Sequence, residues 1–523
     1  MFQGAAARCA VIVAVTFSAL TVADDGRAGA EPIAPRTVPT AKNWVRGDAE
    51  FVLGARARVL YSDAVLGDTA AEFADGLRTA TGKDVVAQAG SAGAAGDIVL
   101  RLGPVPGAPE TLESYRMVVG PTLELQGAGA AGAFYATRSA LQLLRGAAPI
   151  PGGVVTDWPD YAERSLMLDV GRQYLPPDLV RAQIRRMGML KLNVLHLHLS
   201  DTFGFRLEST RHPAITAAQH YSKQEIRDLI AYAARYQVEI VPEVDFPGHM
   251  NGILAAYPEL KLRSAAGVVS DAAIDISDPR SYDLMRDILA EFLPLFPGRY
   301  WHLGADEFLL DGLKVSGYED YPQLGAYARA AYGPQAEPVD ALLGLINWGA
   351  DIVRAHGKRP RIWNDGLHTG AGTLAIGGDI VIDYWSRAGV AQLPLPFFGT
   401  ARTPQDLIAA GHQVKNAAFL PTYFVAGGPA AVVANQPPVF GYELWDPAVF
   451  VDGSRLTPAQ NAANLGSGLH VWCDDPTART PEQIAAAITV PLRVLAQKTW
   501  GPPHPTGYAE FTALAEAIAE PIS

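Results

Sequence analysis

The pattern of apolar and polar residues divides the chain into two regions of different character. In residues 31–157, short apolar runs predict strands at Ile98–Leu102, Tyr115–Val119 and Leu123–Leu125. Residues 69–79 and 130–144 instead place apolar side chains three and four positions apart, which predicts two helices. Segment 146–153 is rich in glycine and proline and predicts a linker. Residues 31–157 are therefore predicted to form a small α/β (α+β) domain.

Residues 158–523 repeat the pattern of a strand followed by a helix. Eight apolar runs predict strands, namely Ser165–Val170, Asn193–His198, Glu239–Pro242, Trp301–Leu303, Arg361–Trp363, Ile380–Tyr384, Val414–Ala417 and Gly468–Val471. Helical spacing recurs between several of them, for example at Pro177–Leu190, Lys223–Tyr236 and Ser281–Phe296. Eight such units predict an α/β fold of the TIM-barrel type, (β/α)8, with insertions in its loops.

Charge and the first residues of the chain narrow the cellular setting. The formal net charge of -12 disfavours nucleic acid and acidic membrane surfaces as partners, because both attract positive charge. Residues 1–30 resemble an export signal, since Arg8 precedes the apolar run Cys9–Val22 and small residues allow cleavage after Ala23 or Ala30. A membrane anchor is the alternative, but the run is shorter than the roughly 20 residues that span a bilayer. We expect a secreted protein without a membrane partner after cleavage; the sequence does not define its oligomeric state.

Polar residues follow the predicted strands of the barrel, where active sites of this fold are built. The strongest signal is the segment WHLGADE, in which Asp306 and Glu307 follow an apolar strand, and Gly304 and Ala305 leave room for a ligand. Neighbouring side chains on extended backbone point in opposite directions, so one acid can support a sugar ring while the other reaches the glycosidic oxygen. The alternative is a helix N-terminus with two acids stabilised by the helix dipole.

Three histidines form a second signal. His196 and His198 share one face of a predicted strand, and together with His249 they are compatible with a zinc site. A packed, hydrogen-bonded histidine pair is the alternative that we favour. Pro247 and Gly248 predict a turn that presents His249, which can then bridge Asp201 and Glu307, although a solvent-exposed loop histidine fits the pattern too.

Tryptophans accompany the late strands of the predicted barrel. Trp363, Trp385, Trp445 and Trp472 each lie near the end of a strand or in the loop beside one. Indole rings stack well on the apolar face of a pyranose, although a single tryptophan is as easily a core residue. Four of them near strand ends favour a sugar-binding site.

Taken together, the segments AGAFYATRSALQLL, RSLMLDVGRQY, LNVLHLHLSD, VPEVDFPGHM and HLGADE resemble glycoside hydrolase family 20, the β-N-acetylhexosaminidases. The resemblance implies retaining hydrolysis in which the substrate's 2-acetamido oxygen attacks the anomeric carbon, without a cofactor or metal. It implies that Asp306 orients the acetamide, that Glu307 is the general acid and base, and that Asp201 and His249 support Glu307. The expected substrate-binding residues are Arg164 for hydroxyl groups, Tyr423 for the acetamide oxygen, Trp363, Trp385 and Trp472 for the pocket walls, and Trp445, Asp474 and His198. The expected partner is an oligosaccharide or glycoconjugate that contains N-acetylhexosamine.

The chain departs from the family pattern at three positions. Thr202 follows Asp201 where a second acid is usual, Val425 follows Tyr423 by two residues where an acid is frequent, and Asp474 replaces a glutamate. Such changes can loosen the pocket for an additional sugar and resemble the lacto-N-biosidase branch, which releases a disaccharide. A metal-dependent barrel hydrolase and a non-catalytic sugar-binding protein remain as further alternatives.

Overall fold

The computed structural model describes residues 36–145, 149–311, 314–315, 317–387, 400–501, 506–518 and 520. The predicted export signal, residues 1–30, lies outside the described residues. Within the described ranges, no helix is long and apolar enough to cross a membrane.

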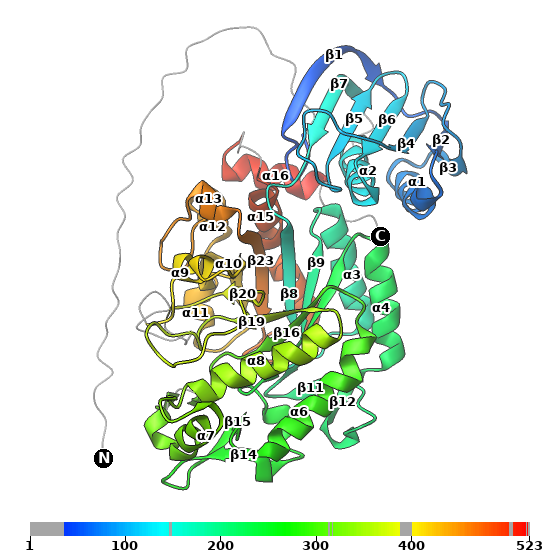
Figure 1. Ribbon diagram of the computed structural model, residues 1–523. Coiled ribbons are helices and arrows are strands. Elements are labelled where there is room, and N and C mark those ends of the chain that lie inside the picture. Colours follow the sequence, from blue (N-terminus) through cyan, green and yellow to red (C-terminus); the bar gives the residue numbers. More distant parts are fainter. Residues whose placement is uncertain are drawn as a thin grey trace, which may run out of the picture. The chain divides into compact units, whose positions relative to one another are not determined.

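The N-terminal region is a seven-stranded mixed sheet with two helices (Figure 1). The strand order is β1-β7-β5-β6-β4-β2-β3, with β1 (Asn43–Phe51), β2 (Arg56–Tyr61), β3 (Asp84–Ala89), β4 (Ile98–Leu102), β5 (Tyr115–Val119), β6 (Leu123–Gly127) and β7 (Ile150–Asp157). Helices α1 (Gly67–Thr81) and α2 (Ala130–Leu144) pack against each other and against the sheet. Helix α1 ends at Gly82, whose φ of 68° is left-handed and favours glycine.

Residues 150–153 of the segment predicted as a linker belong to a strand instead, and residues 146–148 lie outside the described residues. Residues Ile150–Asp157 are β7, which lies between β1 and β5. Its pairing with β1 shifts register between Arg46 and Glu50, and a Cβ on Gly152 would lie 1.5 Å from the carbonyl oxygen of Ala49. Glycine is therefore needed for the close approach of two strands, a requirement that composition does not distinguish from flexibility.

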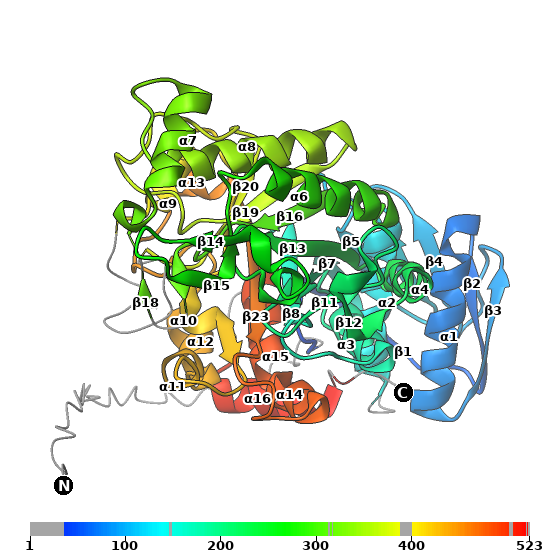
Figure 2. The same ribbon diagram turned by 90° about the horizontal axis from the view of Figure 1, so that it is seen from below.

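The second region contains a closed barrel of eight parallel strands, as predicted (Figure 1, Figure 2). In barrel order they are β8 (Glu163–Asp169), β9 (Val194–His198), β13 (Glu239–Phe246), β16 (Tyr300–Gly304), β19 (Arg359–Trp363), β20 (Val381–Tyr384), β21 (Val414–Asn416) and β23 (Asn464–Trp472). Strand β23 pairs with both β21 and β8 and so closes the sheet. The short strand β22 (Tyr423–Val425) pairs with the last residues of β23 and extends the wall there.

Helices surround the barrel, with one departure from a regular (β/α)8 repeat. They are α3 (Pro177–Met189), α4 (Lys223–Arg235), α5 (Asn251–Leu254), α6 (Pro279–Phe292), α7 (Pro322–Tyr332), α8 (Asp340–Ala355), α9 (Pro404–Ala409), α10 (Phe419–Thr422), α11 (Ala431–Ala434), α12 (Pro438–Leu444), α13 (Pro458–Asn461), α14 (Pro481–Ala487), α15 (Thr489–Trp500) and α16 (Tyr508–Ile518). Residues 364–380, which join β19 to β20 and are all described, contain no helix.

Small strands and turns fill the loops of the barrel. The inserted strands are β10 (Ser200–Asp201), β11 (Gly204–Leu207), β12 (Thr216–Tyr221), β14 (Lys261–Arg263), β15 (Val269–Ile274), β17 (Leu310–Asp311) and β18 (Lys314–Val315). Single 3-10 turns lie in these loops at Pro213–Ile215, Pro258–Leu260, Leu293–Leu295 and Tyr318–Asp320, and one more, Ala64–Leu66, precedes α1 in the N-terminal region. Helix α4 illustrates how local sequence sets a helix start: Ser222 and Glu225 form a reciprocal capping box.

Charged side chains occupy part of the barrel interior. Arg361 Nη1 lies 2.8 Å from Glu163 Oε2, and Arg361 Nη2 lies 2.7 Å from Asp383 Oδ1. Lys415 Nζ lies 3.0 Å from Asp383 Oδ2. All four residues are buried, so each charge depends on the opposite charge beside it.

Candidate active site

The two adjacent acids follow β16 in a turn with unusual backbone. The φ angles of Gly304, Ala305 and Glu307 are 74°, 73° and 46°, all in the left-handed region. A Cβ on Gly304 would lie 1.6 Å from Asp245 Oδ1, so only glycine fits there. The expected extended backbone around Asp306 and Glu307 is therefore wrong, because the strand has already ended in this turn.

His249 brings the two acids together. Its Nε2 atom lies 3.3 Å from Glu307 Oε2 and 3.6 Å from Asp306 Oδ2. Gly248 allows this approach, since a Cβ there would lie 2.7 Å from the carbonyl oxygen of Asp306. Burial opposes a charge on His249, but the carboxylates of Asp201 and Asp306 outweigh it and raise the pKa of His249 well above its ordinary value. The imidazole is thus a cation between acids, and not a solvent-exposed loop histidine.

Asp201 and Arg172 lie behind His249. Asp201 Oδ1 is 3.5 Å from His249 Nδ1, and Asp201 Oδ2 is 3.0 Å from Arg172 Nη2. Burial raises the pKa of Asp201, but the charges of Arg172 and His249 hold it well below its ordinary value. Arg172 also pairs with Asp169 at 3.0 Å and lies 3.9 Å from Asp474. Arg172 was not among the predicted site residues, although it lies just after β8 inside the segment RSLMLDVGRQY.

Arg164 lies at the other end of β8, and its predicted role is wrong. It is the second residue of the strand and has no exposed surface. Its guanidinium donates to Glu113 Oε1 at 2.6 Å, to the carbonyl oxygen of Lys191 at 2.8 Å and to that of Tyr161 at 2.8 Å. Because β8 runs parallel to the other barrel strands, its first residues are remote from the end that carries Asp306. Arg164 stabilises the fold and does not reach this site.

His198 is buried and cannot bind a substrate as predicted. Its Nδ1 and Nε2 atoms lie 2.6 Å from Glu243 Oε2 and 2.8 Å from Asp201 Oδ2, so both ring nitrogens are occupied. Among the described residues, four groups of His, Asp and Glu place three possible ligand atoms within 4.8 Å of one another, but none combines His196, His198 and His249. The favoured interpretation of a packed, hydrogen-bonded histidine agrees with this geometry.

Four aromatic residues gather beside the acids. The ring centroids of Trp363 and Trp472 are 5.9 Å apart, those of Trp472 and Tyr423 are 5.9 Å apart, and Trp385 stacks on Tyr423 at 6.2 Å. Burial and the charge of Asp306 raise the pKa of Tyr423 well above its ordinary value, so its hydroxyl keeps its proton. These four rings form one aromatic group at the carboxyl end of the barrel.

Trp445 and Asp474 were both predicted to bind substrate, and they have different surroundings in the structure. Trp445 follows α12, donates its indole N–H to the carbonyl oxygen of Val449 at 2.9 Å, and lines an apolar cavity with Pro421, Tyr423 and Leu469. These contacts hold Trp445 beside the segment of Tyr423, and its role in sugar binding stays a prediction. Asp474 lies at the site, near Arg172, at the end of β23.

Two further carboxyl groups, Asp245 and Asp365, support the turn that carries the acids. Asp245 Oδ1 accepts from the backbone N–H of Ala305 at 3.2 Å. Asp365 Oδ2 accepts from the N–H of Glu307 at 2.9 Å, and its Oδ1 accepts from Trp385 Nε1 at 2.9 Å. Burial and the charge of Asp306 raise the pKa of Asp365 to about 8, and the same two causes raise that of Asp245 well above its ordinary value.

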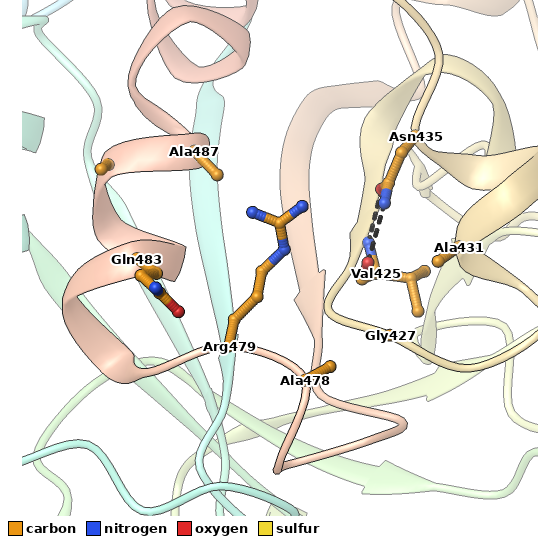
Figure 3. A pocket seen from close by; sticks show the side chains of 9 residues that line it. Val425, Gly427, Ala431, Asn435, Ala478, Arg479, Gln483 and Ala487 are labelled. Atoms are coloured by element: carbon orange, nitrogen blue, oxygen red, sulfur yellow. Dashed lines mark hydrogen bonds between the residues drawn. The ribbon is translucent and has the colours of Figure 1, made fainter.

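A hollow of about 680 Å³ lies between the segment that follows β22 and helix α14, and its lining contains none of the acids or rings described above (Figure 3). It begins at Val425, two residues after Tyr423 on β22, and Gly427 and Ala478 line it. The side chain of Arg479 extends into the hollow (Figure 3). Its lining continues with Ala431, Asn435, Gln483, Ala486 and Ala487.

Family models match both regions of the chain. The model for the catalytic domain of glycosyl hydrolase family 20 matches residues 161–423, and the model for domain 2 of the same family matches residues 34–158. The chain belongs to glycosyl hydrolase family 20. The family matches therefore cover the first sheet and the barrel through the start of β22.

Individual family 20 proteins resemble this chain over different lengths. A lacto-N-biosidase of Bifidobacterium bifidum is 30% identical over 493 residues, which cover 93% of this chain and 42% of that protein. A β-hexosaminidase of Porphyromonas gingivalis is 28% identical over 284 residues, covering 47% of this chain and 34% of that protein. The chain thus spans less than half the length of these two relatives. The solved family 20 β-N-acetylhexosaminidase of Streptomyces coelicolor has a TM-score of 0.72 at 25% identity, covering 94% of this chain and 97% of that chain.

Proposed function

We propose that this family 20 protein is a retaining hydrolase that removes terminal β-linked N-acetylhexosamine, GlcNAc or GalNAc, from oligosaccharides or glycoconjugates. One observation carries the proposal: Asp306 and Glu307 both lie within 3.6 Å of one nitrogen of His249, at the end of the barrel where active sites of this fold are built. Paired carboxyl groups are the usual machinery of glycoside hydrolysis. A protein that only binds sugar has no need of this assembly.

In the proposed reaction the substrate's 2-acetamido oxygen attacks its own anomeric carbon and forms an oxazolinium ion. Asp306 orients and polarises the acetamide, while the protonated hydroxyl of Tyr423 donates to the acetamide oxygen. Glu307 donates a proton to the leaving oxygen and later accepts one from the attacking water. The imidazolium of His249 stabilises the carboxylate that Glu307 becomes.

Two substitutions test this mechanism. Glu307→Gln and Asp306→Asn should each lower kcat on an aryl β-GlcNAc by at least about 100-fold. An oxazoline-mimicking thiazoline should inhibit the wild-type protein. Asp178→Asn is a control, because that side chain is 94% exposed on α3. Full activity in either acid variant, or equally fast hydrolysis of glycosides that lack the N-acetyl group, would disprove the mechanism.

The residues that follow Tyr423 favour a second possible product, a disaccharide. Val425 stands where the family often has an acid, and the hollow of about 680 Å³ that begins there has the size of a small-ligand site. The similarity that covers 93% of this chain is to a lacto-N-biosidase. These observations support release of a Gal–GlcNAc disaccharide, in which the outer sugar occupies space next to Val425.

A comparison of aryl β-GlcNAc with aryl β-lacto-N-bioside distinguishes the two products. Disaccharide release predicts the higher kcat/KM for the lacto-N-bioside, and Val425→Asp should shift that preference toward the monosaccharide by about tenfold. Val432→Asp, at a side chain that is 84% exposed, controls for the added charge, and urea unfolding of Val425→Asp controls for the burial of Val425, which is 1% exposed. Hydrolysis of the monosaccharide substrate alone would exclude the disaccharide proposal.

We further propose that the protein is secreted, on the basis of the predicted signal in residues 1–30. N-terminal sequencing of protein recovered from culture medium should find cleavage after Ala23 or Ala30. Retention of the first residues on an active, cell-associated protein would contradict secretion.

A further inference from the structure

Glu243 lies within β13, in the barrel wall, and has no exposed surface. Its Oε1 atom accepts a hydrogen bond from Trp363 Nε1 at 2.7 Å, and its Oε2 atom lies 2.6 Å from His198 Nδ1. An indole N–H can only donate, so the direction of the bond from Trp363 is fixed. One carboxylate thus holds two rings that come from two other strands, β9 and β19.

From His198 a continuous chain of contacts leads to the proposed general acid. His198 Nε2 lies 2.8 Å from Asp201 Oδ2, and Asp201 Oδ1 lies 3.5 Å from His249 Nδ1. His249 Nε2 in turn lies 3.3 Å from Glu307 Oε2. Carboxylate and imidazole therefore alternate from Glu243 to Glu307, and the opposite charges of neighbours stabilise one another.

The charges in this series of contacts favour an ionised Glu243 and a doubly protonated His198. Burial opposes ionisation of Glu243, but the His198 cation holds its pKa well below the ordinary value. Burial also opposes charge on His198, yet Glu243 and Asp201 raise its pKa well above the ordinary value. Asp169 and Asp245 lie in the same cluster, and His196 and His302 each lie 3.0 Å from a Glu243 oxygen. A doubly protonated His198 donates a hydrogen bond from both ring nitrogens, which fixes the orientation of the imidazole ring.

The other bond of Glu243 fixes the aromatic group. Trp363 is almost fully buried, and its ring centroid lies 5.9 Å from that of Trp472 and 4.8 Å from that of His302. Rotation of its indole would lose the bond to Glu243 and displace Trp472. Glu243 therefore touches both this aromatic packing, through Trp363, and the series of histidine and carboxylate contacts, through His198.

We propose that Glu243 is a positioning residue that fixes, at the same time, the histidine relay behind Glu307 and the indole of Trp363. This inference rests on the hydrolysis proposed above and extends it to a residue that does not contact the substrate.

Glu243→Gln separates the two contacts. Glutamine has the same shape, and its carbonyl oxygen still accepts from Trp363, so KM should stay within about twofold of the wild-type value. Its amide group faces His198 with a donor, which makes His198 neutral and leaves Arg172 as the cation beside Asp201 on that side. We expect kcat to fall about tenfold at about pH 7. The alkaline limb of the kcat profile should move to higher pH, because the charge lost nearest to His249 is positive.

Glu163→Gln is the matched control, since Glu163 is also a buried barrel glutamate and pairs with Arg361 at 2.8 Å. It should lower the free energy of unfolding without moving the alkaline limb. The inference is refuted if Glu243→Gln leaves the limb and kcat unchanged, or if both variants lose kcat equally at every pH. An inactive wild-type protein would instead refute the proposed function.

If Glu243→Gln does not fold, the protonation state of His198 can be measured directly in the wild-type protein. In wild-type protein labelled at histidine, NMR should show the His198 ring fully protonated between about pH 5 and about pH 8. His198→Asn assigns the signal. Titration of that signal with an ordinary pKa of about 6.5 would refute the inference whether or not any substrate is cleaved.

Discussion

Replacing Arg172 should lower the activity, whereas replacing Arg164 should lower only the stability, although both arginines belong to the β8 segment. Arg172 lies beyond the carboxyl end of the strand, with its two terminal nitrogens 3.0 Å from Asp201 and 3.0 Å from Asp169. Arg164 lies at the amino end, with its guanidinium 2.6 Å from Glu113. Substitution by methionine keeps most of the apolar stem of either side chain and removes its charge. Only Arg172→Met should lower the rate of hydrolysis.

The structure sets the size of both effects. Arg172→Met takes the cation away from Asp201 and Asp169, which have no exposed side-chain surface. Breaking a buried ion pair costs about 3 to 5 kcal/mol, and we expect about 3 kcal/mol because Asp201 keeps His198 as a partner. Activity should fall about 100-fold, since Asp201 no longer holds His249 in one position. Arg164→Met should cost about 4 kcal/mol of folding free energy and change kcat by less than about twofold.

Urea unfolding gives the stability of each variant, and titration with a tight thiazoline inhibitor gives the fraction of folded, binding-competent protein. The value of kcat per competent molecule then separates loss of folding from loss of function. If Arg164→Met lost kcat per competent molecule as severely as Arg172→Met, the assignment of the two ends of β8 would be wrong. Full activity of Arg172→Met would refute the role of Arg172.

Further substitutions and conditions give three more expectations. Gly304→Ala should abolish activity, because its Cβ would lie 1.6 Å from Asp245, whereas Gly333→Ala, with φ of 104° and no atom within 4 Å, should cost only about 1 kcal/mol in urea unfolding. Asp365, with a pKa of about 8 when folded and about 3.9 when unfolded, contributes stability below pH 4 that is lost as pH rises to about 8. Asp365→Asn should therefore remove a slope of about 1.4 kcal/mol per pH unit from unfolding curves in that range. Chelators should leave kcat unchanged, and a loss that zinc restores would favour the metal-dependent alternative.

The barrel and its site end were predictable because their signals are local in the sequence. An apolar run followed by Asp306 and Glu307 marks the end of β16, and the Pro247–Gly248 turn marks the position of His249. In a parallel barrel the carboxyl ends of all strands meet at one face, so residues from different strands were expected together. Asp201 and His249 do lie in contact.

The errors occurred where position within an element matters more than residue type. Arg164 and Arg172 are eight positions apart in one segment, and only the exact end of β8 decides which one reaches the site. For Glu243, buried in the middle of β13, sequence gives no signal at all, because its partners come from β9 and β19.

The buried carboxyl groups explain how the barrel holds a strained turn beneath the reacting acids. Non-glycine residues with left-handed φ cost about 1 to 3 kcal/mol each, and Ala305 and Glu307 both have such values. The backbone N–H of each donates to a buried carboxyl oxygen, Asp245 for Ala305 and Asp365 for Glu307. Loss of Asp365 would leave the N–H of Glu307 without this acceptor, which costs about as much as the strain, whereas the N–H of Ala305 also donates to the carbonyl oxygen of Phe246 at 3.1 Å. The turn therefore persists because relaxing it would break both bonds, and Asp306 and Glu307 are held in place before any substrate arrives.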